Sequence, residues 1–233
     1  MKAARNSSRE GTAISRLIIW DYDGTLAWSL PQQLAAFNAA VVRALGHALE
    51  PEAITARFGP PDEGVIAGLV PRARYPEAVR EFYETYRRLE PATEVVPELL
   101  AFIRESRRQG VHHAVVTNKG RVSATISLRH KGLGPALDAI VTGDDMRAPK
   151  PDPDGLEQAI ALAARRGFTG SRREVAFVGD SPGDVLAARA AGVVAFWVAY
   201  GRLHDRLPPE VVPDGMAETP AALLHLLEAW LAG

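Results

Sequence analysis

The stretch Asp21-Tyr22-Asp23-Gly24-Thr25-Leu26 decides how this chain is interpreted. It follows the apolar run Leu17–Trp20, which is typical of a buried strand. Two carboxylates placed two residues apart at a strand end cannot both face a hydrophobic core, because burying unpaired charge is very costly. They fit the rim of a parallel sheet, where open α/β folds bind their ligands. The simpler interpretation is a strand followed by an Asp-Gly turn, since both residue types favour turns.

The same two acids suggest a chemistry. Clustered carboxylates repel each other, and a bound divalent cation would relieve that repulsion. Asp21 is then suited to attack a phosphorus atom, while Asp23 is suited to transfer protons.

Composition narrows the class of protein. The 233 residues are 47% hydrophobic, which is enough for one large domain or a domain with an insertion. The 27 basic and 28 acidic residues nearly cancel, so no field favours nucleic acid or an anionic membrane. The absence of cysteine excludes disulfides, thiol catalysis and cysteine metal sites. No apolar run approaches the roughly 18 residues of a spanning helix, and the polar start of the chain is unlike a secretory signal, so we expect a cytoplasmic protein.

Apolar runs and helical patterns alternate along most of the chain. Five runs predict strands: Leu17–Trp20, His113–Val116, Ala139–Val141, Val175–Val178 and Val193–Val198. Five helical patterns follow the same order: Pro97–Gln109, Arg121–Lys131, Pro153–Arg166, Asp184–Ala191 and Pro220–Leu231. Such alternation predicts a parallel, right-handed α/β sheet.

The gap between the first two strands breaks this alternation. From Ala27 to Val96 there is no good strand pattern, but three helical patterns occur, at Pro31–Leu45, Asp62–Leu69 and Tyr75–Leu89. The segment is too long for one crossover connection. We therefore expect a helical cap at 28–96, a core formed by 16–27 and 97–233, and a frayed tail at 1–15.

Further polar groups fall at the other predicted strand ends. Thr117 and Asn118 follow the second strand and, with the first N–H groups of a helix, suit a phosphoryl oxygen. Taken alone, this pair is more often a helix cap. Lys150 lies between two prolines that restrict its backbone, although solvated loop lysines are common.

The fourth strand is followed by two more carboxylates, Asp180 and Asp184. With Asp21 they offer the hard oxygen ligands that Mg²⁺ prefers. The alternative is a capped helix with an acid in its first turn. Polar groups of these kinds, namely acids, a hydroxyl and a lysine, follow four strands of one predicted sheet. Such a grouping is unlikely to arise by chance, so together the motifs indicate a site.

These motifs resemble those of the haloacid dehalogenase-like hydrolases, in their phosphoglycolate phosphatase-like branch. The four family motifs appear in order as Asp21–Leu26, Thr117-Asn118, Lys150-Pro151, and Gly179-Asp180 with Asp184. The resemblance implies a Rossmann-like core with a central first strand, helices on both faces and an inserted α-helical cap.

The resemblance also implies roles. Asp21 is expected to be the nucleophile that forms an aspartyl-phosphate, and Asp23 the acid and base. Thr117, Asn118 and Lys150 are expected to bind the phosphoryl group. Mg²⁺ is expected on Asp21, the Asp23 carbonyl and Asp180, with Asp184 in support.

An acid at Asp23 favours a phosphatase or phosphomutase, because family dehalogenases lack it. We expect a Mg²⁺-dependent hydrolase of a small phosphorylated metabolite, acting as a monomer or homodimer, with a phosphomutase or pyrophosphatase as alternatives. Trp28 stands where the branch usually carries an acid, and an indole there could pack on a substrate or only stiffen the hinge. Arg57 could reach an anionic substrate tail or remain a surface arginine.

Two other readings compete. Gly179–Gly183 matches the Gly-x-Ser-x-Gly elbow of serine hydrolases, with His204, Asp205 and His225 downstream. However, Pro182 follows the serine and has no N–H for an oxyanion hole. A receiver-type phospho-switch also pairs acids with Thr and Lys, but it has no use for a cap or for Asp23.

Overall fold

A computed structural model describes residues 15–201 and 206–233 of the chain. The predicted tail, apart from Ser15, and the pair His204 and Asp205 lie outside these residues.

The centre of the fold is a six-stranded parallel sheet in the order β5-β4-β1-β6-β7-β8. Its strands are β1 (Leu17–Trp20), β4 (His112–Val116), β5 (Ala139–Val141), β6 (Val175–Gly179), β7 (Val194–Val198) and β8 (Gly215–Ala217). The five predicted strands and the central place of the first are confirmed. The edge strand β8 was not predicted, because its three residues include a glycine and an exposed methionine.

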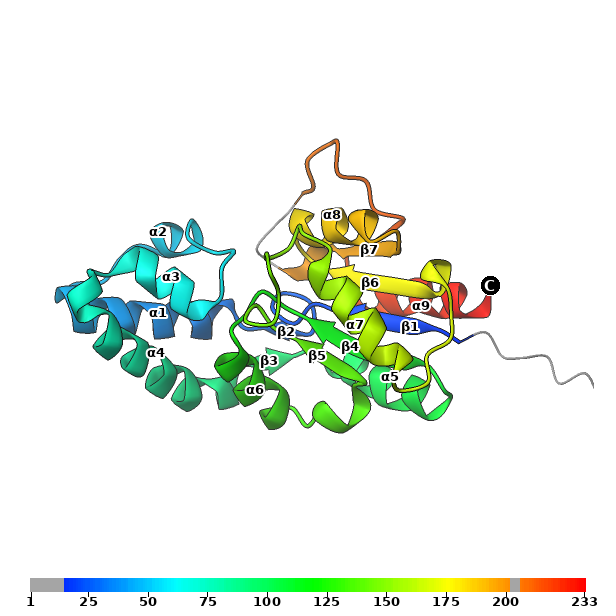
Figure 1. Cartoon of the computed structure of the whole chain (residues 1–233), viewed down its shortest axis with the longest axis horizontal. Coiled ribbons are helices and arrows are strands. Elements are labelled where there is room, and N and C mark those ends of the chain that lie inside the picture. The colour runs from blue at the N-terminus through cyan, green and yellow to red at the C-terminus, as the bar shows by residue number, and fades with distance from the viewer. Residues whose placement is uncertain (1–14, 202–205) are drawn as a thin grey trace, which may run out of the picture.

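Helices cover both faces of this sheet (Figure 1). They are α5 (Pro97–Arg108), α6 (Arg121–His130), α7 (Asp154–Ala164), α8 (Pro182–Ala190) and α9 (Pro220–Ala232). Leu17 and Ile19 pack with α7 and α8 on one face, whereas Ile18 and Trp20 pack with α5, α6 and α9 on the other. Burial on both faces explains why β1 is a continuous apolar run instead of an alternating one. The predicted Rossmann-like α/β fold is confirmed.

Four α-helices between β1 and α5 pack on one another and form what we call the helical unit. They are α1 (Leu30–Leu45), α2 (Pro51–Thr55), α3 (Asp62–Leu69) and α4 (Tyr75–Leu89). The unit has its own core, in which the rings of Phe37 and Phe82 lie 4.6 Å apart. Figure 1 shows it at the end of the molecule away from α9. The short helix α2 was missed, since five residues carry little periodicity.

Two short strands join the helical unit to the sheet. Ala27–Trp28 (β2) pairs antiparallel with Glu94–Val95 (β3), on the two segments that connect the unit to β1 and α5. The expectation that no strand lies between Ala27 and Val96 was therefore wrong. Two residues are too few to show an alternating pattern, so no local pattern indicates this ribbon.

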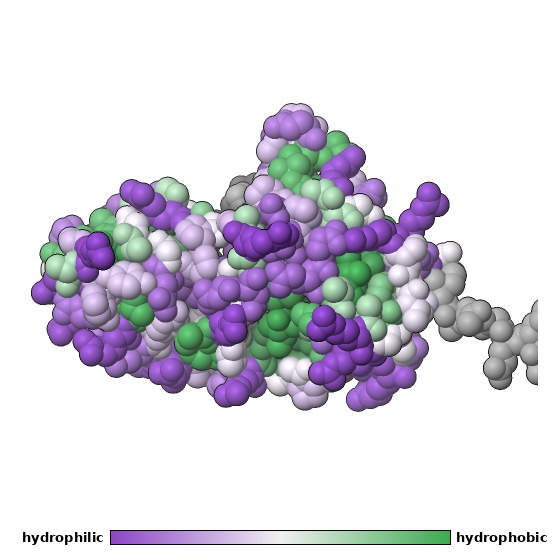
Figure 2. Space-filling model, viewed as in Figure 1, coloured by the Kyte–Doolittle hydropathy of each residue, from purple (hydrophilic) through white to green (hydrophobic). Residues whose placement is uncertain are grey.

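The visible surface is largely hydrophilic, including that of the helical unit (Figure 2). None of the helices in the described ranges is long and apolar enough to cross a membrane. The cytoplasmic location stays a prediction.

Candidate active site

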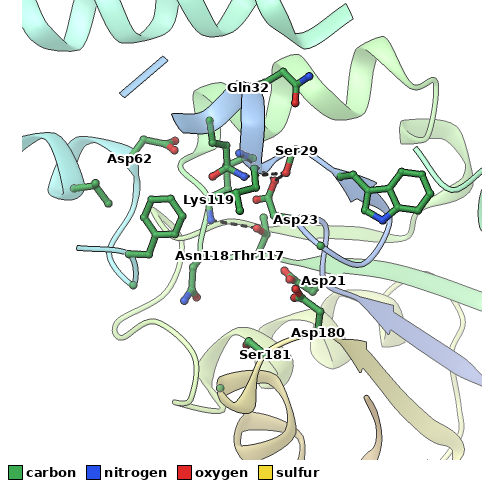
Figure 3. Close-up of a pocket in the computed structure, with 18 of the residues that line it drawn as sticks. Asp21, Asp23, Ser29, Gln32, Asp62, Thr117, Asn118, Lys119, Asp180 and Ser181 are labelled. Carbon is green, nitrogen blue, oxygen red and sulfur yellow. Dashed lines mark hydrogen bonds and ion pairs between the residues drawn. The ribbon is translucent and has the colours of Figure 1, made fainter. Parts of the chain in front are cut away.

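Three carboxylates meet at the carboxyl ends of the two central strands. Asp21 follows β1 and Asp180 follows β6, and these strands are neighbours in register. Asp184 comes from the first turn of α8, where its side chain completes a capping box with Ser181. All three are buried, and each offers an oxygen within 4.8 Å of the others. Figure 3 shows the Asp21 and Asp180 side chains next to each other.

Lys150 contacts two of these three carboxylates. Its Nζ lies 2.8 Å from Oδ1 of Asp21 and 2.6 Å from Oδ1 of Asp184. Its backbone N–H donates to the Asn118 side-chain oxygen over 3.0 Å, so Asn118 fixes the loop that carries the lysine. Burial opposes a charge on Lys150, but the Asp184 and Asp21 carboxylates outweigh it and raise the pKa of the amine. Lys150 is therefore a fixed cation.

One lysine does not balance three acids. Burial, with repulsion from Asp184 and Asp23, raises the pKa of Asp21 to about 7 despite Lys150. Burial and the neighbouring Asp21 also raise the pKa of Asp180 well above its usual range. Oδ2 of Asp180 is buried and has no hydrogen-bond partner among the described residues. A buried excess of hard oxygen ligands fits a divalent cation, so Asp21, Asp180 and Asp184 could hold one.

Asp23 turns away from this cluster. Its Oδ1 accepts a hydrogen bond from the Ser29 hydroxyl and lies 3.3 Å from Nζ of Lys119. Figure 3 shows Ser29 beside Asp23. Gln33 in turn donates to Ser29 Oγ over 2.9 Å, so a chain of hydrogen bonds runs from α1 to Asp23. The Asp23 carboxylate is thus outside the group that could bind a metal, and metal binding by its carbonyl stays a prediction.

Lys119 is a buried cation that the sequence analysis did not single out. Its side chain is 1% exposed, and its Nζ lies 4.8 Å from the centre of the Tyr86 ring. Burial opposes its charge, but Asp23 and further neighbours outweigh this and raise its pKa well above the usual range. Among the described residues, the cavity therefore has two fixed cations, one beside each proposed catalytic acid.

Thr117 directly follows β4, two residues before Lys119. It is buried, and its Oγ1 accepts a hydrogen bond from the Lys119 N–H over 3.2 Å. The alternative role as a helix cap does not hold, since the residue that precedes α6 is Gly120. The carboxylate of Asp62 accepts the Gly120 N–H instead.

A cavity of about 630 Å³ contains these groups. It lies between the carboxyl ends of the strands and the helical unit, which adds Gln32, Gln33, Phe37, Phe58 and Val65 to its wall. Trp28 of β2 also lines it and is half-buried. The structure does not bring Arg57 there: its side chain is exposed and lies beside Gly68. Of the predicted substrate-binding residues, Arg57 is the exception.

Sequence reasoning missed Asp62 as well as Lys119 and Ser29. Asp62 begins α3 and is 4% exposed, although an acid in a first helical turn normally faces solvent. The only signal was its place directly after Pro60-Pro61. Its partner Gly120, the residue before α6, is 58 residues away in the chain, so no local pattern connects the two.

Ser181 is not arranged as a nucleophile. Its Oγ donates to Oδ2 of Asp184 over 2.7 Å within the capping box of α8. His225 lies on α9 with 85% of its side chain exposed, 3.8 Å from Glu228. Within the described ranges, no histidine contacts Ser181, and the serine-hydrolase interpretation has no structural support.

The chain was compared with known proteins. Residues 18–198 match the family model described as haloacid dehalogenase-like hydrolase. A plasmid-encoded phosphoglycolate phosphatase of Cupriavidus necator is 34% identical over 218 residues, covering 90% of this chain and 92% of the relative. The pyrophosphatase PpaX of Bacillus velezensis is 28% identical over 212 residues, covering 90% and 94%.

A solved structure from Haemophilus somnus, described as a predicted phosphoglycolate phosphatase, shares the fold. Its TM-score is 0.78 at 22% identity, covering 93% of this chain and 100% of the other. The matched range contains the acidic cluster, Thr117, Lys119 and Lys150. The chain belongs to the haloacid dehalogenase-like hydrolase family, in its phosphoglycolate phosphatase-like branch.

Proposed function

We propose that this protein is a Mg²⁺-dependent phosphatase that hydrolyses small phosphate monoesters through an aspartyl-phosphate on Asp21. The observation that carries the proposal is the position of Asp21. This residue is buried, its Oδ1 lies 2.8 Å from the Lys150 amine, and a second acid, Asp23, lines the same cavity. The phosphoglycolate phosphatase relatives support the reaction class.

Asp21, Asp180 and Asp184 would hold the ion, with the Asp23 carbonyl as a further proposed ligand. When bound, Mg²⁺ neutralises charge on the phosphoryl oxygens and on the buried carboxylates. Phosphoryl transfer depends mainly on such positioning and charge stabilisation.

The first step forms a bond between an Asp21 carboxylate oxygen and phosphorus while the ester bond to the alcohol oxygen breaks. Asp23 gives its proton to that alcohol oxygen. Lys150 and Thr117 hold the phosphoryl oxygens at the strand ends. Ser29 and Lys119 contact Asp23 and fix its orientation.

In the second step Asp23 removes a proton from water, and the resulting hydroxide oxygen attacks phosphorus. The bond between phosphorus and Asp21 breaks, which releases inorganic phosphate and restores both carboxyl groups. Hydrolysis of pyrophosphate is a second candidate, favoured by the relative from Bacillus velezensis. A phosphomutase would use the same intermediate.

The test measures p-nitrophenyl phosphate turnover with Mg²⁺, after EDTA, and after Mg²⁺ is restored. Activity should disappear in chelator and return with the ion. Rapid-quench labelling should find an acid-stable phosphoprotein in wild type and in the control Glu98→Gln, which changes an exposed acid of α5. Full activity in EDTA would contradict the metal-dependent mechanism.

A further inference from the structure

The charges in the cavity are unevenly placed. The described residues that line it include two cations, Lys119 and Lys150, and no arginine or histidine. Lys150 contacts Asp21 and Asp184, and Lys119 contacts Asp23. Both lysines therefore already have carboxylate partners, Lys150 at the reacting end and Lys119 between Asp23 and the Tyr86 ring of the helical unit.

The wall near the helical unit has the opposite character. Phe37, Phe58 and Val65 make it apolar, and Trp28 adds an indole from β2. Its polar members near α1 are neutral amides and a hydroxyl, with Gln32 and Gln33 on the first turn of the helix.

The acids on this side would repel an anionic leaving group. Asp62 and Glu94 both line the cavity. A carboxylate on the substrate would lose water, would have to compete with Asp23 for Lys119, and would face these acids. The described wall therefore disfavours a substrate whose leaving group carries a negative charge.

The volume of the cavity also favours a large, apolar leaving group. Pockets of about 300–1,000 Å³ suit ligands of drug size, and this cavity measures about 630 Å³. A two-carbon leaving group would leave most of the apolar wall in contact with water, whereas a ring would cover it.

We propose that the leaving group is an uncharged, ring-bearing alcohol whose ring packs on Phe58 and Trp28 and whose polar atoms meet Gln32 and Gln33. This inference rests on the proposed phosphatase function and names its substrate class. It makes phosphoglycolate, whose leaving group is an acid, a poor substrate for this chain.

Two matched pairs of esters test the proposal in the purified, Mg²⁺-loaded protein. Phosphoglycolate and its amide differ only in the tail charge, and kcat/KM should favour the amide by about tenfold or more. Benzyl phosphate and ethyl phosphate differ in the ring, and kcat/KM should favour benzyl phosphate by a similar factor. p-Nitrophenyl phosphate serves as the reference ester.

Variants separate the two features. Phe58→Ala should lower kcat/KM for benzyl phosphate by a larger factor than kcat/KM for ethyl phosphate. Gln32→Lys adds a cation to the wall and should raise kcat/KM for phosphoglycolate relative to kcat/KM for its amide. Val42→Ala, at an exposed site on α1, is the control and should alter no ratio.

The outcomes are distinct. If wild type hydrolyses p-nitrophenyl phosphate but prefers phosphoglycolate to its amide, or ethyl to benzyl phosphate, the substrate class is wrong and the phosphatase function stands. If no ester is hydrolysed with Mg²⁺ present, the proposed function fails and the inference falls with it.

Discussion

Asp62 of the helical unit accepts a hydrogen bond from the backbone N–H of Gly120, the residue that precedes α6, over 2.9 Å. The Ser123 hydroxyl donates to the same carboxylate oxygen. The N-terminus of a helix carries partial positive charge and unpaired N–H groups, so the acid is well placed there. Asp62 thus caps a helix of the core from a different part of the fold and holds the helical unit beside Lys119.

Replacing Asp62 should loosen this contact. Hydrogen bonds to a charged group are worth about 1.5–3 kcal/mol, and Asp62→Ala would also leave the Gly120 N–H without its acceptor. We expect kcat/KM for p-nitrophenyl phosphate to fall about 5- to 30-fold, which corresponds to 1–2 kcal/mol, and proteolysis of the unit to accelerate.

Ser123→Ala removes one partner of the same oxygen and should have a smaller effect. Because both variants break one contact, their combination should cost less than the sum of the two. Glu63→Ala, which removes the neighbouring acid that binds Tyr75 within the unit, is the control and should leave kcat/KM near wild type. Full additivity of Asp62→Ala and Ser123→Ala would mean that the two act separately.

Gly24 offers a second prediction. Its φ of +80° is a left-handed conformation, and a Cβ there would lie 2.0 Å from Oδ2 of Asp180. Gly46 has a φ of +81° and open space around it. Alanine at either site should lower the free energy of unfolding by about 1 kcal/mol through backbone strain.

The two variants should differ in activity. Only Gly24→Ala displaces Asp180, so only it should weaken Mg²⁺ activation, seen as a higher Mg²⁺ concentration for half-maximal turnover. Gly46→Ala should keep the wild-type Mg²⁺ dependence. An equal change in both would show that the left-handed strain, and not the acidic cluster, controls activity.

The sequence predicted the sheet, and also which polar side chains gather at its edge, because both follow from local patterns. Continuous apolar runs mark strands buried on both faces, and the residues just after them must share one edge of a parallel sheet. Asp21, Thr117, Lys150 and Asp180 were found for this reason.

The parts that were missed depend on contacts between distant segments. The ribbon of β2 and β3 is too short to show a period, and Asp62 becomes a buried cap only when the helical unit meets α6. Arg57 was chosen for its charge and its position in the cap, but its side chain points to Gly68 and solvent. Side-chain direction depends on packing, which no local pattern records.

Asp21 and Asp23 should respond differently to the same substitution. Asp21→Asn removes the attacking carboxylate, so no phosphoenzyme should form. Asp23→Asn leaves the nucleophile but removes the acid and base, which typically contributes about 10²–10⁴-fold. Rapid-quench labelling at matched times separates the two cases, and substantial turnover by Asp21→Asn would refute the assignment.

His113 gives a prediction about stability and pH. It is fully buried on β4, where its Nδ1 accepts a hydrogen bond from Trp20 Nε1 over 3.1 Å and its Nε2 lies 2.9 Å from Ser106 Oγ. Ser106 Oγ itself donates to the Phe102 carbonyl over 2.6 Å. All of these hydrogen bonds can form at once when His113 is neutral and carries its proton on Nε2.

Burial, with repulsion from Arg107 and His112, lowers the pKa of His113 to about 3 from its usual 6.5. Between these values the unfolded chain binds a proton that the folded protein excludes. The contribution of His113 is therefore fully present above pH 6.5 and is lost as the pH falls towards 3, by about 1.4 kcal/mol per pH unit.

His113→Gln keeps an acceptor and a donor but cannot titrate. It should be less stable than wild type at pH 7, yet the difference in free energy of unfolding between the two should shrink as the pH falls from 6.5 to 4. Urea unfolding across this range measures that difference, while other titrating groups cancel between the proteins. His225→Gln, at an exposed site on α9, should leave the wild-type profile unchanged. A constant gap between wild type and His113→Gln would show that the folded protein accommodates a charged imidazole at this position.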